Sequence, residues 1–304
     1  MSFTAKDVQA LREKTGCGMM DCKKALTESQ GNVEKAIEIL REKGLAAASK
    51  KAGRIAAEGV VYGLVNDDAS VGTIIEVNSE TDFVAKNDEF IKFVNKCAKT
   101  VIDENPSDVN ELLEIMPNGE KVTVAELLRE KILTIGENIK IRRFVRYEGN
   151  VCTYIHGGGR IGVMVNFDAS KELAKKPEFN EMAKNVAMQI AAANPSFVDK
   201  KSVPSETIEK EKEILTAQAI NEGKPTAIAE KMVMGRIGKF YKDVCLLEQA
   251  YIKNSDINVA KYIDEVSKEL GGAISVNSFV RFEKGEGLEK REDNFADEVA
   301  SMIK

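Results

Sequence analysis

The stretch VGTIIEVNSETDFVAKNDEF, residues 71–90, changes its pattern twice. Its first part, VGTIIEV, alternates and is rich in β-branched residues, which predicts a half-buried strand. A short polar turn follows, and Glu89 then opens an apolar-periodic segment that predicts a helix. A strand that leads through one turn into a helix indicates a mixed architecture. We therefore expect the α+β fold class.

The same pattern returns later in the chain at a fixed spacing. The Glu-Gly pair at 58–59 recurs at 148–149, and the glycine at 72 recurs at 162, both 90 residues further on. We therefore expect a duplicated core, in which each copy is a hairpin, a helix or two and a closing strand. The further matches are Glu89-Phe90 with Glu178-Phe179, Val124-Ala125 with Val259-Ala260, and FVRYE at 144–148 with FVRFE at 279–283.

Residues 1–55 predict a small bundle of three short helices. Thr4 is a candidate N-cap for the first helix, and Gly44 is expected to end the third. Met19 and Met20 stand side by side at the turn between the first two helices. Because adjacent residues on a helix cannot both face one core, we expect one of them to be exposed.

The rest of the chain is expected to form two core subdomains, 56–147 and 148–283, and a C-terminal helical module, 284–304. An insert at about 203–245 interrupts the second subdomain. It holds two amphipathic segments around a Gly-Lys-Pro turn, which predicts a protruding antiparallel helical hairpin. The apolar stripe of this hairpin fits either a homodimer or docking against the body. The last short helix carries three apolar residues on one face: Phe295, Val299 and Met302.

The composition favours a globular protein that binds another protein. A net charge of -5 argues against nucleic acid as the principal partner, because phosphate binding needs a concentrated basic face. No apolar run approaches the roughly 20 residues that span a bilayer, and the first residues lack a signal core. Five cysteines, an odd number, fit reduced thiols better than a disulfide framework. We expect a cytoplasmic protein without membrane contact.

Several stretches look like chemistry but lack the partners that chemistry needs. HGGGR at 156–160 resembles an esterase oxyanion loop, yet no Gly-x-Ser-x-Gly motif accompanies it, and a hairpin turn explains the glycines. Cys17 and Cys22 lack a second pair at metal-ligand spacing and are expected in the core. No Gly-x-x-x-x-Gly-Lys-Ser/Thr loop occurs. With His156 as the one histidine, we expect no enzyme, no cofactor, no metal and no direct nucleotide binding.

An acid and a large aromatic residue, Asp82 and Phe83, stand together in the polar turn. The simplest interpretation places Phe83 in the core. Sliding the sequence by 90 residues sets Glu172 against Asp82 and Leu173 against Phe83, so the second copy has no aromatic residue here. This difference indicates that Phe83 meets a demand that the fold alone does not impose. A core of different shape is the alternative.

Two stretches resemble the signature motifs of the elongation factor Ts family: LREKTGCGMMDCKKAL at 11–26 and EVNSETDFVAKN at 76–87. The resemblance extends over the whole chain, and the N-terminal bundle is similar to ubiquitin-associated domains. It implies a guanine nucleotide exchange factor for elongation factor Tu. Such a protein promotes GDP release from its partner, allows GTP to bind, and has no catalytic chemistry of its own.

The resemblance also implies which residues meet the partner. One segment projects from the core and inserts between two helices of the partner's GTPase domain, where it disturbs the magnesium and phosphate contacts. The bundle and the C-terminal module add contacts on that domain, and the second core copy contacts another domain. The implied residues are Thr81, Asp82, Phe83 and Val84 in the projecting segment; Met19, Met20 and Lys23 in the bundle; His156 in the second copy; and Phe295, Val299 and Met302 in the module.

Two rival classes stay open at this point. A ubiquitin-associated-like adaptor without exchange activity would use the bundle alone, and would leave Asp82, Phe83 and the hairpin insert without a role. A hydrolase built on HGGGR would need a nucleophile that the sequence does not offer. An exchange factor is the class that gives each of these features a use.

Overall fold

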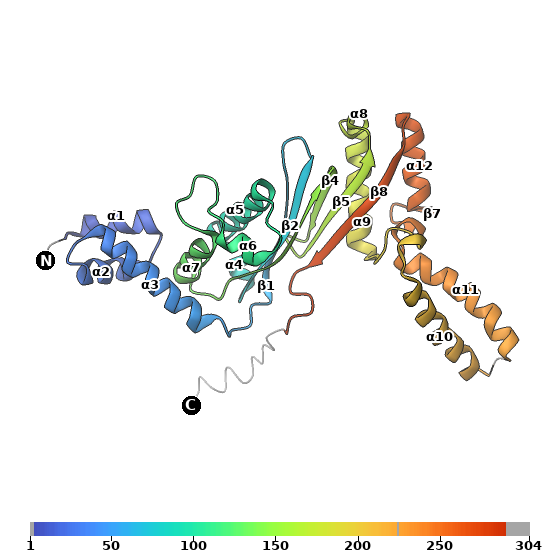
Figure 1. The fold of residues 1–304 in the computed structure, drawn as a ribbon, viewed down its shortest axis with the longest axis horizontal. Helices are drawn as coiled ribbons and strands as arrows, with labels where there is room; N and C mark the ends of the chain where they lie inside the picture. The colour runs from blue at the N-terminus through green and yellow to red at the C-terminus, as the bar shows by residue number, and fades with distance from the viewer. Residues whose placement is uncertain (1–2, 224, 290–304) are drawn as a thin grey trace.

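The computed structural model describes residues 3–223 and 225–289. Two three-stranded antiparallel sheets lie face to face at the centre, with helices on the outer side of each (Figure 1). A three-helix bundle lies at one end of the molecule and a helical hairpin at the other. The prediction of an α+β fold is confirmed.

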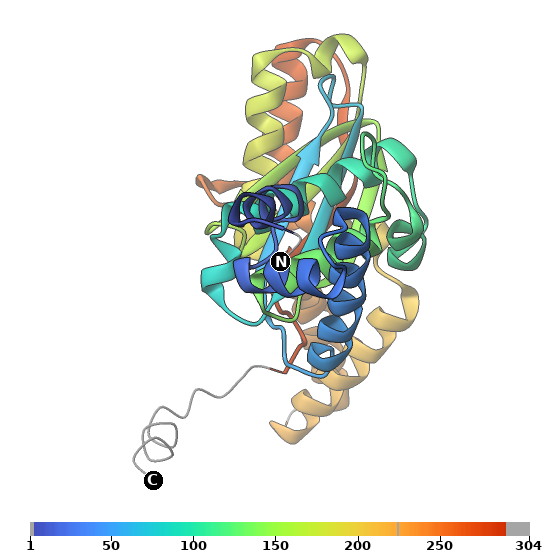
Figure 2. The same ribbon diagram turned by 90° about the vertical axis from the view of Figure 1, so that its left-hand side faces the viewer.

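Helices α1 (Ala5–Thr15), α2 (Met19–Glu28) and α3 (Val33–Lys51) form the bundle, which faces the viewer in Figure 2. Thr4 caps α1 as predicted, because its hydroxyl oxygen accepts from the backbone N–H of Asp7 at 3.4 Å, and the Asp7 carboxylate in turn accepts from the backbone N–H of Thr4 at 2.7 Å. The bundle has its own hydrophobic core, in which Cys17 and Cys22 are buried. Their expected place in the core is confirmed.

The prediction that Gly44 ends the third helix is wrong, since α3 continues to Lys51. Gly44 is buried where α3 crosses α7 (Val124–Ile135), and a Cβ there would lie 3.5 Å from the carbonyl oxygen of Arg129. A glycine inside a helix costs conformational entropy but allows two backbones to approach. At 3.5 Å a Cβ would be in ordinary van der Waals contact, so this crossing does not require glycine, and the long α3 carries the bundle onto the core.

The first sheet has the strand order β1 (Glu58–Val65), β2 (Val71–Ser79), β3 (Lys140–Glu148). Four helices connect β2 to β3, more than the one or two expected. Buried residues such as Phe90 and Leu112 pack these helices on one face of the sheet. The four helices are α7 and, before it in the chain, α4 (Asp82–Ala85), α5 (Asp88–Glu104) and α6 (Val109–Glu114).

The second sheet repeats this order with β4 (Asn150–His156), β5 (Ile161–Ala169) and β8 (Ile274–Glu283). Helices α5 and α9 have 17 residues each, and α7 and α12 have 12 each. The two halves thus share strand order and helix lengths. The helices of the second half are α8 (Lys171–Ala174), α9 (Pro177–Ala193) and α12 (Val259–Leu270).

The repeated glycines lie where the two sheets meet. A Cβ on Gly72 would lie 2.6 Å from a methyl group of Val151, and a Cβ on Gly162 would lie 2.4 Å from one of Val61. Real Cβ atoms do not approach this closely, so only glycine lets the sheets pack at this distance. The three glycines of HGGGR have φ of 59°, 63° and 95° and connect β4 to β5. The predicted hairpin turn is therefore confirmed.

Helices α10 (Ser205–Asn221) and α11 (Thr226–Val244) pack against each other and project from the body, as predicted for the insert (Figure 1). Leu215, Val233 and Ile237 form their small shared core. A second hairpin, β6 (Ala250–Tyr251) with β7 (Asn254–Asn258), was not predicted. Two short 3₁₀ helices flank the insert, Lys200–Ser202 and Leu246–Glu248.

The chain returns to the first sheet after β8, around the buried Glu76 of β2. The Glu76 carboxylate accepts hydrogen bonds from Arg142 at 2.9 Å, from Arg143 at 2.6 Å and from the backbone N–H of Gly285 at 2.8 Å. Burial raises the pKa of Glu76, but these donors outweigh it, so the pKa is lowered overall. This ionic contact ties the end of the second half to the first.

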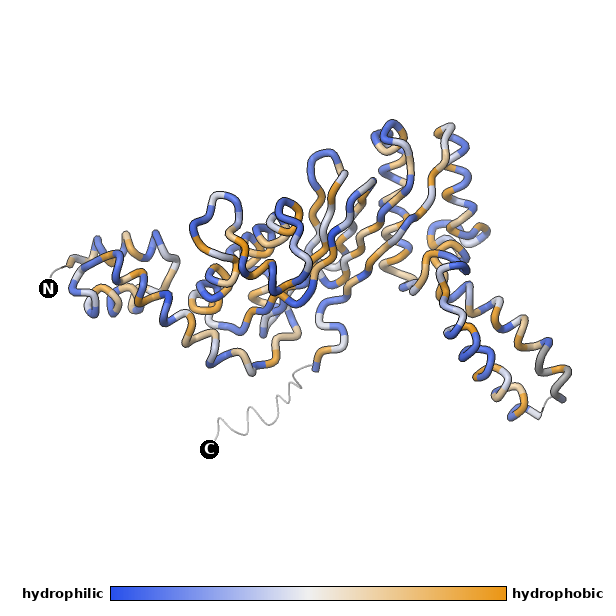
Figure 3. Tube along the Cα trace, viewed as in Figure 1, coloured by the Kyte–Doolittle hydropathy of each residue, from blue (hydrophilic) through white to orange (hydrophobic). Residues whose placement is uncertain are grey.

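Hydrophobic residues follow the strands and the helices packed on them, while the tip of the β1–β2 hairpin is hydrophilic (Figure 3). No helix in the described ranges is long and apolar enough to cross a membrane.

Candidate functional site

Phe83 lies on α4, the short helix that follows β2, and its side chain is 79% exposed. It is the most exposed large hydrophobic residue among those that the structure describes. The simple interpretation of Phe83 as a core residue is therefore wrong. An aromatic ring held in solvent on a helix next to the core is available for a contact with another molecule.

The neighbours of Phe83 differ sharply in burial. Val84 is 8% exposed and packs into the core beneath α4, so it anchors the projecting segment rather than extending it. Asp82 is exposed and pairs with Lys86 at 2.9 Å, and the hydrogen bond from Lys86 lowers the pKa of Asp82. The segment therefore presents an ionised carboxylate beside an aromatic ring.

The alignment of the two copies by 90 residues is wrong at this point. Helix α4 begins at Asp82 and α8 at Lys171, a spacing of 89 residues, because the turn before α4 holds one residue more. Leu173 is therefore the counterpart of Val84, and both are buried. The counterpart of Phe83 is Glu172, which is exposed. The position that Phe83 occupies in the first copy therefore faces solvent in both copies of the fold.

Thr81, at the start of α4, is held by Glu137, which follows the end of α7. The Glu137 carboxylate accepts hydrogen bonds from the backbone N–H groups of Glu80 and Thr81, both at 3.0 Å, and from the Thr81 hydroxyl at 2.6 Å. Thr81 is half-buried. Glu137 was not identified from the sequence.

A shallow depression runs beside Phe83. Its lining includes Gly16 from the bundle, Asn87 between α4 and α5, and Lys131 from α7. The depression thus connects the projecting segment with the first turn of the bundle. A partner that contacts Phe83 can reach the bundle without leaving this surface.

The predicted bundle residues lie at the start of α2. Met19 is 44% exposed, Met20 is 60% exposed, and Lys23 is exposed. Both methionines face solvent, although only one was expected to do so. The start of α2 therefore offers two flexible apolar side chains and one cation on one turn of helix, a surface suited to protein contact.

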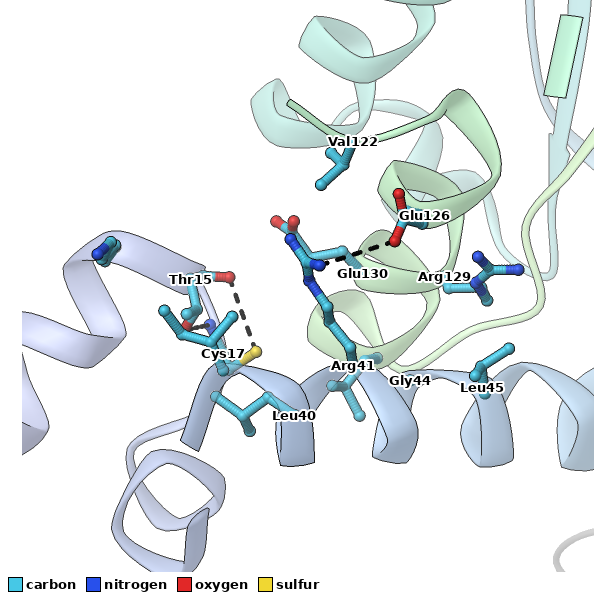
Figure 4. A pocket seen from close by; sticks show the side chains of 13 residues that line it. Thr15, Cys17, Leu40, Arg41, Gly44, Leu45, Val122, Glu126, Arg129 and Glu130 are labelled. Atoms are coloured by element: carbon cyan, nitrogen blue, oxygen red, sulfur yellow. Dashed lines mark hydrogen bonds and ion pairs between the residues drawn. The ribbon is translucent and has the colours of Figure 1, made fainter. Parts of the chain in front are cut away.

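A cavity of about 260 Å³ lies between the bundle and α7 (Figure 4). Arg41 of α3 reaches across it toward Glu126 of α7, at 3.8 Å. Burial raises the pKa of Cys17 on one wall, which keeps the thiol protonated. The bundle thus contacts the core through α3 and α7 with incomplete packing between them.

His156 is exposed at the end of β4, where its Nδ1 lies 3.0 Å from the Tyr154 hydroxyl. It is on the second half of the core, far along the chain from the projecting segment. The other predicted contact, the helix with Phe295, Val299 and Met302, lies outside the described residues. Within residues 3–223 and 225–289, no group of three His, Cys, Asp or Glu side chains is arranged to hold a metal ion.

Comparison with known proteins gives one consistent result. A family model described as elongation factor TS matches residues 80–286. A protein of Clostridium perfringens strain 13 named elongation factor Ts is 57% identical over 303 residues, which cover 99% of each chain. A protein of the same name from Clostridium botulinum strain Alaska E43 is 55% identical over 304 residues, again 99% of each chain.

Proposed function

The chain belongs to the elongation factor Ts family, and we propose that it is a guanine nucleotide exchange factor for elongation factor Tu. It binds the GDP form of the partner, promotes GDP release and allows GTP to enter. The observation that carries this proposal is the 79% exposure of Phe83 on a helix fixed to the core. An aromatic ring kept in water costs solvation free energy unless a partner covers it.

Phe83 acts as a wedge in this proposal. The projecting segment enters between two helices of the partner's GTPase domain, with Asp82 beside the ring. Moving those helices disturbs the contacts to magnesium and to the phosphates of GDP. The partner's nucleotide is released without any covalent step, so the protein is not an enzyme in the chemical sense.

Thermodynamic linkage sets the size of the effect. If the factor weakens GDP binding, GDP weakens binding of the factor by the same ratio. Each tenfold loosening requires about 1.4 kcal/mol of differential interaction. Burial of one Phe side chain supplies roughly 1.5 to 3 kcal/mol. The wedge alone can thus weaken GDP binding by about ten- to hundredfold, and a larger weakening requires further contacts.

Those further contacts are the bundle residues Met19, Met20 and Lys23 on the GTPase domain, and His156 on another domain of the partner. The shallow depression beside Phe83 supports a continuous surface from the projecting segment to the bundle. The C-terminal helix with Phe295, Val299 and Met302 adds a third contact. The helical hairpin (α10 and α11) is proposed either to dimerise or to remain a monomeric projection.

The protein is proposed to act in the cytoplasm without binding nucleotide, nucleic acid or membrane itself. It lacks the phosphate-binding loop that nucleotide binding requires, and its net charge is -5. The competing function is a ubiquitin-associated-like adaptor. That function would need only the bundle, and it leaves the exposure of Phe83 without a purpose.

Size-exclusion chromatography with purified elongation factor Tu separates the two functions. An exchange factor forms a stable complex with nucleotide-free partner and releases it when GDP is added, as linkage requires. An adaptor would instead bind ubiquitin and leave the elution of elongation factor Tu unchanged. A complex with elongation factor Tu that GDP does not dissociate would contradict the proposal.

A further inference from the structure

We infer that Glu137 is a positioning residue for Phe83, an inference that rests on the proposed exchange function. Its carboxylate takes three hydrogen bonds from the turn before α4: two backbone N–H groups, of Glu80 and Thr81, and the Thr81 hydroxyl. Hydrogen bonds to an ionised carboxylate are stronger than neutral ones. Glu137 thus fixes the residue at which the Phe83 helix starts.

Helix α4 needs such support, because four residues form no stable helix by themselves. Its buried anchor is Val84, which packs below the ring-bearing turn. Ala85 packs beside it, partly buried, but two adjacent side chains near the end of the helix do not fix its start. Thr81, tied to Glu137, supplies a second fixed point, and the two together determine the direction in which Phe83 points.

The second half of the core provides an internal comparison. Ser170, at the start of α8, uses its hydroxyl as an ordinary cap and accepts from the N–H of Leu173 at 3.3 Å. Thr81 makes no such cap within α4, and its hydroxyl donates to Glu137 instead. The hydroxyl at the start of the helix is therefore redirected in the half that carries the exposed ring.

The carboxylate itself also belongs to one half only. Glu137 follows Gly136, which ends α7, whereas Gly272 follows Gly271, which ends α12. A Cβ on Gly272 would lie 2.6 Å from a methyl group of Leu173, so a side chain there would require Leu173 to shift. The extra turn residue, the redirected hydroxyl and the carboxylate thus occur together, next to the exposed aromatic ring.

The same contacts extend to the bundle. The Glu80 carboxylate accepts from the backbone N–H of Asn138 at 2.6 Å and pairs with Arg54 at 3.4 Å. Asn138 in turn donates to the carbonyl oxygen of Arg54 at 2.8 Å. Arg54 lies in the connection from α3 to β1. The turn that positions Phe83 is therefore joined both to the α7–β3 connection and to the segment that leads from the bundle.

Two substitutions at one position separate positioning from simple packing. Glu137→Ala removes all three hydrogen bonds. Glu137→Gln keeps an oxygen for the two backbone N–H groups, and its amide N–H can donate to the Thr81 hydroxyl, which also accepts. We expect Glu137→Ala to lower the maximal rate of GDP release by about tenfold, since small misplacements of a functional group are costly. Glu137→Gln should restore most of that rate.

The rate is measured by stopped-flow release of fluorescent GDP from elongation factor Tu at increasing concentrations of full-length factor. Because the other contact surfaces are unchanged, the half-saturating concentration should shift by less than about threefold. Amide hydrogen exchange of the free factor gives a second readout that needs no partner. Glu137→Ala should remove the protection of the Glu80 and Thr81 amides, and Glu137→Gln should keep it.

Wild type and Phe83→Ala, run in parallel, distinguish the levels of failure. If wild type does not accelerate release, the exchange function is wrong. If wild type is active and Phe83→Ala is too, the wedge is wrong. The positioning role is wrong if Phe83→Ala slows GDP release while folded Glu137→Ala accelerates it as wild type does. It is also wrong if Glu137→Ala keeps the protection of the Glu80 and Thr81 amides. Ser170→Ala in the second half is the matched control and should leave exchange unchanged. Should Glu137→Ala fail to fold, Thr81→Val replaces it.

Discussion

Phe83 and Val84 are adjacent in the chain but point to different sides of α4, the first 79% exposed and the second 8% exposed. Val84 packs into the core of the first half, and Phe83 is left in solvent. The fold therefore uses the smaller residue of the pair for stability and leaves the larger one free. This separation makes the structural and the functional roles of the segment testable one residue at a time.

The first prediction is that truncating the smaller side chain, Val84, destabilises the protein more than truncating the larger one, Phe83. Val84→Ala should destabilise the protein by about 1 to 3 kcal/mol, because it removes buried methyl groups. Phe83→Ala should cost no more than about 0.5 to 1 kcal/mol, because an exposed ring has little packing to lose. Leu173→Ala, at the buried counterpart of Val84, is the control and should cost about 2 to 5 kcal/mol. Chemical denaturation measures all three, and a larger loss for Phe83→Ala than for Val84→Ala would contradict the assignment.

The second prediction concerns the bundle. Replacing Met19, Met20 and Lys23 together by alanine should weaken association with elongation factor Tu by about tenfold or more, since exposed Met side chains lose partner contact. The thermal unfolding midpoint should stay within a few degrees of wild type because all three side chains are exposed. Titration calorimetry and thermal melts provide the two measurements. A collapse of the midpoint would show that these residues support the bundle rather than a partner.

The third prediction follows from the lowered pKa of Glu76, whose ordinary value is 4.5. A carboxyl group with a lowered pKa in the folded state stabilises the protein above its unfolded pKa and loses that effect as the pH falls through the folded pKa. Glu76→Gln should cost about 3 kcal/mol at pH 7, because Arg142 and Arg143 lose a buried ionic partner. The difference in unfolding free energy between Glu76→Gln and wild type should decrease below about pH 4.5. Urea denaturation from pH 7 to pH 3 tests it, and a difference independent of pH would refute this role.

A fourth prediction concerns nucleotide binding. The factor alone should give no heat of binding with GDP or GTP at micromolar concentrations, because the sequence has no phosphate-binding loop. Calorimetry of the factor, with elongation factor Tu as the positive control, makes the measurement. Micromolar binding to the factor alone would mean that it carries a nucleotide site of its own.

Much of this architecture follows from the sequence, for identifiable physical reasons. The pattern of residues 71–77 predicts a strand at β2, capping residues predict the start of α1, and the repeated glycines mark positions where sheets leave no room for a side chain. The prediction that this strand is half-buried is wrong, because the second sheet covers one face of β2 and helices cover the other. The extension of α3 beyond Gly44 could not be predicted, because it depends on the crossing with α7, which is distant in sequence.

The candidate site was predictable only in part. The pairing of Leu173 with Phe83 failed because the first half has one more residue in its turn, and a single residue changes which side of the helix a position occupies. Glu137 gave no signal of its own, since its hydrogen-bond partners Glu80 and Thr81 lie 57 and 56 residues away in the chain. Comparing Gly136-Glu137 with Gly271-Gly272 would have exposed the difference between the halves.

The central claim is that Phe83 displaces groups that hold GDP in the partner. Asp82 enters the same site, so the double variant Asp82→Ala/Phe83→Ala should lose less than the sum of the single losses. Glu172→Ala, at the exposed counterpart in the second half, is the control and should exchange like wild type.

The most direct test is stopped-flow release of fluorescent GDP from elongation factor Tu at saturating factor. With folded Phe83→Ala as the factor, elongation factor Tu should release GDP about ten- to hundredfold more slowly than with the wild-type factor, as expected for the loss of roughly 1.5 to 3 kcal/mol of burial. Wild-type rates from folded Phe83→Ala would contradict the account.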